Sequence, residues 1–166
     1  MKIPIYQVDA FANEQFKGNP AAVCPLDSWL SDNLMQNIAA ENNLSETAFF
    51  IKDKSEYKLR WFTPKGEIDL CGHATLASAY VIFEYFDKNK SEIVFKTKSG
   101  KLKVIKEKNL IKMTFPKREG KKCIAPKALV KGLGKKPKEV YKSRDYMAVF
   151  ENKKDIENLD LNMEEL

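Results

Sequence analysis

Short apolar or alternating segments, separated by turn residues, recur through the first 115 positions of the chain. Alternation of polar and apolar positions is the pattern of a strand with one buried face. Gly18-Asn19-Pro20 and Thr63-Pro64-Lys65-Gly66 are turn signals, and Pro25 is expected to end the strand that precedes it. The pattern predicts strands at residues 3–11, 21–24, 47–51, 57–62, 93–97, 102–106 and 110–115, of which 47–51 and 57–62 form a hairpin.

Two segments have helical spacing instead. Ser31 is suited to cap a helix in which Leu30, Leu34 and Ile38 share one face, with an end near Asn42-Asn43. A second helix begins within residues 70–75 and continues to about Phe86. It is apolar on most sides, which is the pattern of a helix buried all around.

A nearly all-apolar helix among many short strands restricts the fold. A curved sheet buries such a helix on every side, whereas a flat sheet covers one face only. We therefore predict an α+β fold in which a curved, mostly antiparallel sheet or barrel wraps around a central apolar helix.

The chain becomes polar and charged at residues 116–122, which is the composition of a linker. Beyond it the pattern predicts a helix at 126–133, a strand at 146–150 and a further helix that opens at Asp155 and runs toward Leu166. We assign residues 1–118 to one domain and 119–166 to the start of a second. About 45 residues are too few for a self-sufficient core, so we expect a fragment or truncation of a longer protein.

Composition excludes several classes of function. Cys24, Cys71 and Cys123 are widely spaced and His73 is the single histidine, so no zinc motif or disulfide framework is indicated and no metal site is predicted. The net charge is +6, with a lysine-rich stretch at 117–138 that lacks aromatic residues for base stacking. We expect a solvated surface there and no nucleic-acid partner.

Membrane association is not indicated either. No apolar run approaches the roughly 18 to 20 residues that cross a bilayer, and the N-terminus lacks the charged-then-apolar pattern of a signal peptide. A cytoplasmic protein without a membrane partner is expected.

Gly72 stands at the start of the apolar helix, where unpaired backbone N–H groups and the helix dipole favour an anion. A glycine lets a ligand approach the main chain closely, and His73 and Thr75 offer side-chain hydrogen bonds. Glu46 precedes an apolar strand and is suited to general acid/base work if its site is closed. From spacing alone, a plain turn glycine and an exposed strand-end glutamate are the alternatives.

Cys71 has two interpretations. The helix N-terminus could lower its pKa and make the thiolate a base, but buried cysteines are more often inert members of a core. The residue is therefore a candidate catalytic group and not an assigned one.

Four motifs in series resemble the PhzF-like (phenazine biosynthesis F) isomerase and epimerase family. Their order and spacing both fit, and the resemblance spans residues 1–166. The motifs are Val8-Asp9-Ala10-Phe11 with Gly18-Asn19-Pro20-Ala21-Ala22-Val23, Leu44-Ser45-Glu46-Thr47-Ala48-Phe49, Trp61-Phe62-Thr63-Pro64, and Leu70-Cys71-Gly72-His73-Ala74-Thr75.

The resemblance implies a diaminopimelate-epimerase-like fold of two similar domains with a substrate cleft between them. It implies that Glu46 is the general acid/base, that His73 is a polar group of the cleft, and that Gly72 and the amides of Ala74 and Thr75 bind the anion. No metal or organic cofactor is implied. Cys71 occupies the place of a catalytic thiol in diaminopimelate epimerases and proline racemases, whereas some PhzF-like proteins have alanine there.

The expected function is a cofactor-independent isomerase or epimerase that moves a proton on a small carboxylate-bearing metabolite. The motif of the family's second half, which contains an aspartate, is not found in this sequence. Two alternatives stay open: a cysteine-based amino-acid racemase or epimerase, and a truncated, non-catalytic domain that binds a small anion. A homodimer is the assembly to test.

Overall fold

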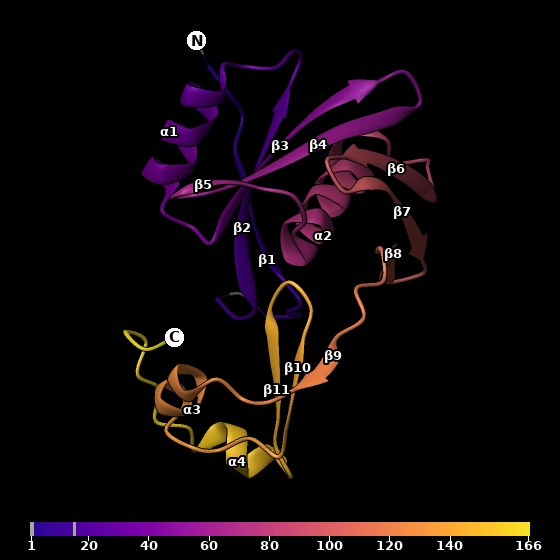
Figure 1. The fold of residues 1–166 in the computed structure, drawn as a ribbon. Helices are drawn as coiled ribbons and strands as arrows, with labels where there is room; N and C mark the ends of the chain where they lie inside the picture. Colours follow the sequence, from indigo (N-terminus) through magenta and orange to yellow (C-terminus); the bar gives the residue numbers. More distant parts are fainter. Residues whose placement is uncertain (1, 15) are drawn as a thin grey trace. The chain divides into compact units, whose positions relative to one another are not determined.

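The computed structural model describes residues 2–14 and 16–166 (Figure 1). Two compact units make up the chain, Met1–Phe115 and Pro116–Leu166. The first unit contains the curved sheet and the apolar helix, and it confirms the predicted α+β class.

The sheet of the first unit has eight strands in the order β1-β2-β3-β4-β6-β7-β8, with β5 paired to β4. Two neighbouring pairs, β2/β3 and β4/β6, are parallel and the others are antiparallel. Within the described residues no pairing joins the edge strands β1 and β8, so the sheet curls without closing into a barrel. The strands are β1 (Tyr6–Ala10), β2 (Asn19–Leu26), β3 (Glu46–Asp53), β4 (Glu56–Thr63), β5 (Gly66–Ile68), β6 (Glu92–Thr97), β7 (Gly100–Glu107) and β8 (Leu110–Thr114).

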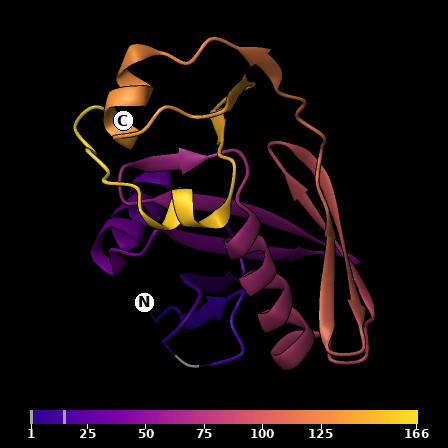
Figure 2. The ribbon, with the colours of Figure 1, turned by 90° about the horizontal axis from the view of Figure 1, so that it is seen from below.

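Helix α2 (Gly72–Val81) lies inside the curl, with β1–β4 on one side and β6–β8 on the other (Figures 1 and 2). Its inward positions are mostly small, including Ala74, Ala77 and Ala79, all fully buried. The strands supply the large side chains of this core, among them Trp61 and Phe95. Small helix residues let a strongly curved sheet approach the helix axis closely while large strand residues fill the remaining space.

The predicted helix extends to Phe86, but its last turn widens. Residues Ile82–Phe86 form a π-helical turn, closed by a hydrogen bond of 2.8 Å from the Asp87 N–H to the Ile82 carbonyl. Such wide turns within helices are rare.

Helix α1 (Asp32–Asn42) covers the opposite face of β2–β4. Ser31 caps it as predicted, its hydroxyl accepting a hydrogen bond from the Leu34 N–H. The most deeply buried residues of this helix are Met35 and Ala39, which lie beside the predicted face. Because these strands are covered on both faces, consecutive residues such as Phe49 and Phe50 enter two different cores.

Pro25 does not end its strand, contrary to the prediction, and β2 also includes Pro20. Pro25 lies beyond Val23, the last β2 residue paired with β1, and Pro20 precedes Ala21, the first paired with β3. Each proline therefore stands where one neighbouring strand is absent, and its missing N–H interrupts no ladder.

The second unit contains a three-stranded antiparallel sheet in the order β11-β10-β9. Its elements are β9 (Lys121–Cys123), α3 (Lys127–Leu133), β10 (Glu139–Lys142), β11 (Tyr146–Val149) and α4 (Lys153–Glu157). Strand β9 corrects the predicted linker, whose last residues pair with β10. Whether this unit begins a further domain stays a prediction.

The helix predicted from Asp155 toward Leu166 is wrong in its extent. Helix α4 ends at Glu157, and the Asn162 N–H donates a hydrogen bond of 2.8 Å to the Gly132 carbonyl of α3. A Cβ atom added at Gly132 would lie 2.5 Å from the Leu166 side chain. Contacts with α3 therefore prevail over the local helical pattern.

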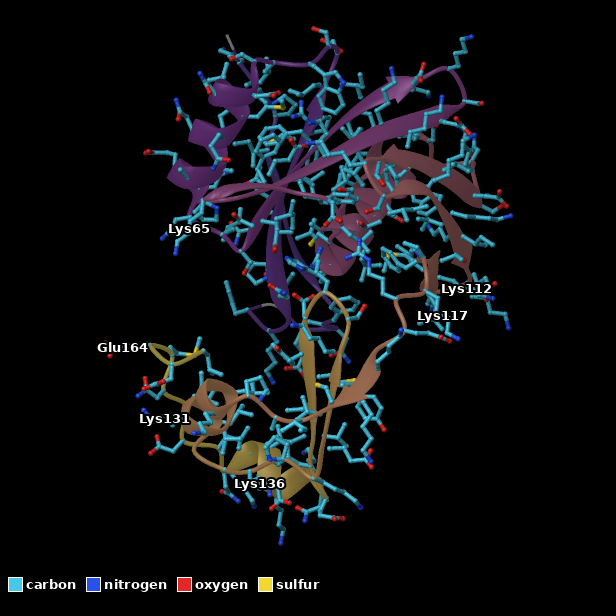
Figure 3. The ribbon with its side chains drawn as sticks, viewed as in Figure 1. Lys65, Lys112, Lys117, Lys131, Lys136 and Glu164 are labelled. Carbon is cyan, nitrogen blue, oxygen red and sulfur yellow. The ribbon has the colours of Figure 1, made fainter. Side chains whose placement is uncertain are left out.

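The lysine-rich stretch carries ion pairs within the second unit. Lys122 pairs with Glu139, Lys131 with Glu165, and Lys135 with Asp155. Figure 3 labels Lys131 and Lys136 at the periphery of this unit. Across the part of the chain that the structure describes, no helix has the length and apolar character needed to cross a membrane.

Asp87 joins the end of the central helix to the β3–β4 hairpin. Its carboxylate accepts hydrogen bonds of 2.7 Å from the Lys52 amino group and the Tyr57 hydroxyl, and Lys90 Nζ lies 2.7 Å away. The hydrogen bond from Lys52, followed by that from Lys90, lowers the pKa of Asp87 below its ordinary value.

Replacing this carboxylate should make stability depend less on pH. A group whose pKa is depressed by folding stabilises the native state above its unfolded pKa, about 3.9 for aspartate, and loses that effect as the pH falls. We expect Asp87→Asn to lower the free energy of unfolding by about 1–2 kcal/mol at pH 7. The difference in unfolding free energy between wild type and variant should shrink below about pH 4. Urea unfolding measures it, and Asp27→Asn, at an exposed position, is the control. A difference that does not vary with pH would contradict the role given to Asp87.

Candidate active site

Glu46 is the first residue of β3, where it stands opposite Ala21 of the parallel strand β2. The turn before it is set by the capping residue of α1, Asn43, which has left-handed backbone geometry (φ 49°). The Asn42 side-chain amide donates a hydrogen bond of 3.1 Å to the Thr47 hydroxyl. The end of one helix therefore positions the start of the strand that carries Glu46. The sequence did not point to Asn42 for this task, since an asparagine at a helix end is common in any fold.

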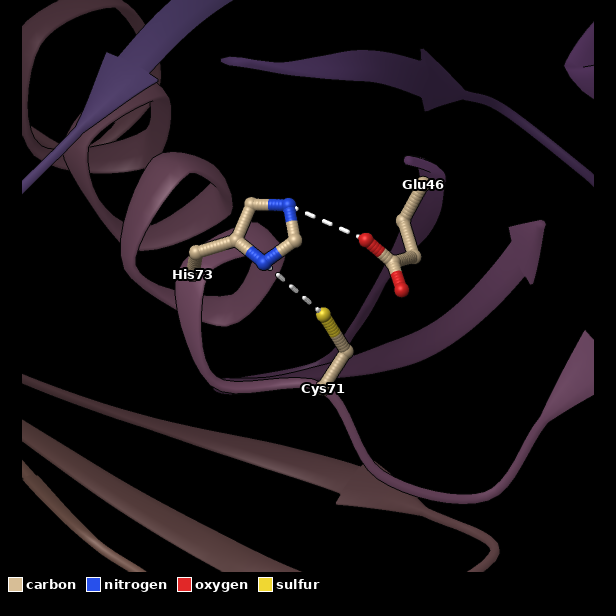
Figure 4. A group of neighbouring side chains, drawn as sticks. All are labelled: Glu46, Cys71 and His73. Carbon is tan, nitrogen blue, oxygen red and sulfur yellow. Dashed lines mark hydrogen bonds and ion pairs between the residues drawn. The ribbon is translucent and has the colours of Figure 1, made fainter. Parts of the chain in front are cut away.

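Cys71 is the residue that immediately precedes α2, and its backbone is extended (φ −143°, ψ 125°). This conformation directs the Cys71 side chain and the first helical turn toward Glu46, as Figure 4 shows. The Thr75 hydroxyl donates a hydrogen bond to the Cys71 carbonyl and so fastens the start of the helix. Thr75 is fully buried.

Three side chains meet at this point (Figure 4). The imidazole of His73 lies between the other two, with Nε2 3.1 Å from Glu46 Oε2 and Nδ1 3.4 Å from Cys71 Sγ. Cys71 and His73 are 7% and 8% exposed, and the Glu46 side chain is 16% exposed. Glu46, from the start of β3, thus joins two residues at the start of α2 in a compact polar cluster.

The contact between Glu46 and His73 is close but incomplete. Nε2 and Oε2 are not aligned for a hydrogen bond, and neither atom has another hydrogen-bond partner among the described residues. Buried polar atoms nearly always have partners, so each one without a partner calls for an explanation. The pair has hydrogen-bonding capacity that the described residues leave unused.

The Cys71 thiol is protonated at neutral pH. Burial raises its pKa to about 12, an effect that the nearby N–H groups of Ala74 and His73 only partly offset. The negative charge of Glu46 acts in the same direction as burial. These surroundings are the opposite of the electropositive, accessible setting of a reactive thiolate.

The first turn of α2 is open at Gly72. This residue is exposed, and a Cβ atom added there would meet nothing within 4 Å. The Cys71 side chain makes no capping hydrogen bond to the helix. Space is therefore open at Gly72 itself, whereas the N–H groups of His73 and Ala74 lie near the Cys71 sulfur and the side chains of Ala74 and Thr75 are buried.

The same three residues are a candidate metal set, which the sequence spacing did not indicate. One ligand atom from each of Glu46, Cys71 and His73 lies within 4.8 Å of the others. An ion would use only one imidazole nitrogen, and the other nitrogen would keep its present neighbour. Three protein ligands would leave at least one position of a tetrahedral site open.

Arg60 of β4 and Glu67 of β5 are charged residues on neighbouring strands. Arg60 forms a two-pronged ion pair with Glu67, with distances of 2.7 and 2.8 Å, and also binds Asp32. Arg60 and Glu67 thus connect β4, β5 and α1 and are structural.

Comparison with known proteins places the chain in a family. The family model described as "Phenazine biosynthesis-like protein" matches residues 8–166. An uncharacterized isomerase of Pseudomonas aeruginosa is 49% identical over 156 residues, which cover 94% of this chain and 60% of that protein. The chain thus spans about 60% of the length of this curated relative.

Solved structures agree with this assignment. A phenazine biosynthesis protein of the PhzF family from Enterococcus faecalis superposes with a TM-score of 0.90 at 44% identity, over 100% of this chain and 64% of that one. A predicted epimerase from Pseudomonas aeruginosa matches 99% of this chain and 61% of that one, with a TM-score of 0.68 at 18% identity, and supports the epimerase-type fold alone. The resemblance seen in the sequence is confirmed: the chain belongs to the phenazine biosynthesis-like family, PhzC-PhzF.

Proposed function

We propose that this chain carries the acid–base half of the active site of an isomerase or epimerase that acts on a small carboxylate. The observation that carries the proposal is the buried contact between Glu46 and His73, at the first turn of α2. Membership of a family whose relative is named an isomerase supports the class of reaction.

In the proposed reaction, Glu46 removes a proton from a carbon beside an activating group and returns it at another carbon. A positioned carboxylate in a site of low polarity contributes about 10²–10⁴-fold to the rate of such a transfer. His73 keeps the Glu46 carboxylate in place and offers a second polar contact to the substrate. Every group that these steps use is a protein group, so the proposal includes neither a metal nor an organic cofactor.

The substrate carboxylate is proposed to bind above Gly72. Partial positive charge at the start of a helix stabilises an anion by about 0.3–1 kcal/mol at an exposed site and more where water is excluded. Because Gly72 has no side chain, the anion can approach the backbone N–H groups of the first turn directly.

The cysteine-based racemase is less favoured. It requires a thiolate at Cys71, and the buried thiol with its raised pKa does not provide one at neutral pH. The third alternative is a domain that only binds an anion. Proton transfer requires the Glu46 carboxylate, whereas anion binding alone does not. A homodimer and a cytoplasmic location stay predictions.

Substitution of Glu46 separates catalysis from binding. The assay uses a panel of small carboxylic acids with an acidic C–H bond, dissolved with the native protein in D₂O. We expect deuterium to enter at least one of these acids, and mass spectrometry measures its uptake. Glu46→Gln, which removes the proton acceptor, should lower this rate by about 100-fold or more. Glu41→Gln, at an exposed position of α1, should not change it. Undiminished exchange in Glu46→Gln would refute the role of Glu46.

Substitution of Gly72 tests the anion site without a known substrate. We expect acetate to shift the amide NMR signals of residues 72–75 in the native protein. Gly72→Ala should weaken acetate binding several-fold and leave the melting temperature unchanged or higher, because the new methyl group enters open space. Gly66→Ala, at a second glycine with open space, is the matched control. Equal acetate binding in both variants would place the anion elsewhere.

Alkylation tests the thiol alternative. Treatment of the folded protein with iodoacetamide at pH 8 should modify Cys123, which is partly exposed, well before Cys24 and Cys71. Burial raises the pKa of both Cys24 and Cys71 to about 12, so neither supplies much thiolate. The sites are identified by peptide mass spectrometry, and rapid modification of Cys71 would favour the cysteine-based racemase.

A further inference from the structure

The imidazole of His73 has a different neighbour at each nitrogen. Nδ1 faces the Cys71 sulfur at 3.4 Å, and Nε2 faces the Glu46 carboxylate at 3.1 Å. A neutral imidazole carries one proton, so one of these nitrogens donates and the other accepts. Which nitrogen carries the proton decides what His73 presents to Glu46 and to a substrate.

We propose that Cys71 is a positioning residue whose thiol donates a hydrogen bond to Nδ1 of His73 and thereby keeps the imidazole proton on Nε2, facing Glu46. The three-residue contact in Figure 4 carries this inference. Cys71 then acts through His73 and does not touch the reacting atoms. The part of Cys71 in catalysis rests on the proposed function, whereas the position of the imidazole proton of His73 does not depend on it.

The thiol is able to donate because it retains its proton. Burial is the main reason, and the charge of the Glu46 carboxylate, which is a second possible acceptor for the thiol proton, opposes a further negative charge. Sulfur is a weak acceptor and an S–H group is a weak donor. The hydrogen bond to Nδ1 therefore supplies a small bias, which matters because the two tautomers of imidazole are close in energy.

The contact with Glu46 acts in the same direction. With the proton on Nε2, an N–H group faces a carboxylate oxygen, which is attractive even where the alignment is imperfect. With the proton on Nδ1, the lone pair of Nε2 would face the lone pairs of Oε2 in a buried site, unless Glu46 itself were protonated. Unpaired acceptors in such a site cost about 1–3 kcal/mol.

Cys71 is held in place for this task. Its carbonyl accepts the hydrogen bond from the Thr75 hydroxyl, and its extended backbone directly precedes α2. Because Cys71 and His73 flank Gly72 at the start of one buried helix, the sulfur and the imidazole keep a fixed relation. The proposed tautomer makes His73 a donor, which leaves Glu46 as the proton acceptor of the site.

The single histidine makes the test direct. In protein labelled with ¹⁵N, a long-range ¹H–¹⁵N correlation spectrum contains one imidazole from the chain itself, and the two nitrogen shifts report the tautomer. A pH titration first locates the neutral form. We expect the wild-type protein to show an unprotonated Nδ1 and a protonated Nε2. A protonated Nδ1 in the wild-type protein would overturn the proposal without any variant.

Variants assign the effect to the thiol. Cys71→Ala should move the two nitrogen shifts toward each other, as the tautomers begin to exchange, and Cys71→Ser, which keeps a donor, should restore much of the separation. Cys24→Ala removes another buried thiol, in the core beneath α1, and should leave both His73 nitrogen shifts unchanged. Circular dichroism verifies folding. Unchanged shifts in folded Cys71→Ala would refute the role of Cys71.

Kinetics extend the test to catalysis. Once the deuterium-exchange assay has a substrate, Cys71→Ala should lower kcat several-fold with little change in KM, and Cys71→Ser should recover part of the loss. If Cys71 acted as a base, both Cys71→Ala and Cys71→Ser would lose activity. If no exchange is found for any protein, the proposed function fails, while the NMR result still decides the tautomer.

Discussion

The burial of one apolar helix determines the structure of the first unit. Seven of the ten residues of helix α2 are buried, and the others, Gly72, Leu76 and Tyr80, form one stripe that is partly or fully exposed. The sheet achieves this burial by curling around the helix, and the small residues Ala74, Ala77 and Ala79 allow the strands to come close. A second helix, α1, is then needed on the outer face, because strands covered on one side by α2 still carry large apolar residues such as Phe49 and Phe62 on the other.

The same burial creates the candidate site. A helix buried on most of its sides still has an N-terminus at which N–H groups lack partners within the helix. In this chain that end lies beside the start of β3, so Glu46 meets His73 and Cys71 there. Apolar surroundings strengthen every polar contact in such a cluster and also make unpartnered atoms costly. Gly72, which joins Cys71 to His73, is the open position beside this cluster.

Sequence patterns were sufficient where a segment is decided by its own residues. The helix capped by Ser31, the hairpin of β3 and β4, and the apolar helix with its glycine start were all predicted. Patterns failed where distant contacts decide the outcome. Strands β5, β9 and β10 are short and depend on their partner strands. Pro25 is tolerated within β2 because the pairing with β1 ends before it, and the chain after Glu157 binds α3 instead of continuing as a helix. For the site, the motifs brought Glu46 and residues 71–75 to attention. The contact between His73 and Cys71 was not foreseen, since it depends on the extended backbone at Cys71.

The parallel pairing of β4 with β6 has a consequence for how the first unit folds. Only two residue pairs, Tyr57 with Phe95 and Lys58 with Lys96, join these strands, and α2 is the connection that brings them together. The β6–β8 segment contains mainly local contacts and is able to form early, whereas its attachment to the rest of the sheet requires α2 to be already in place. Contacts between distant segments form slowly because the intervening chain must first be ordered. The helix start that carries the site is therefore expected to be in place before β6–β8 completes the sheet, in the slowest stage of folding.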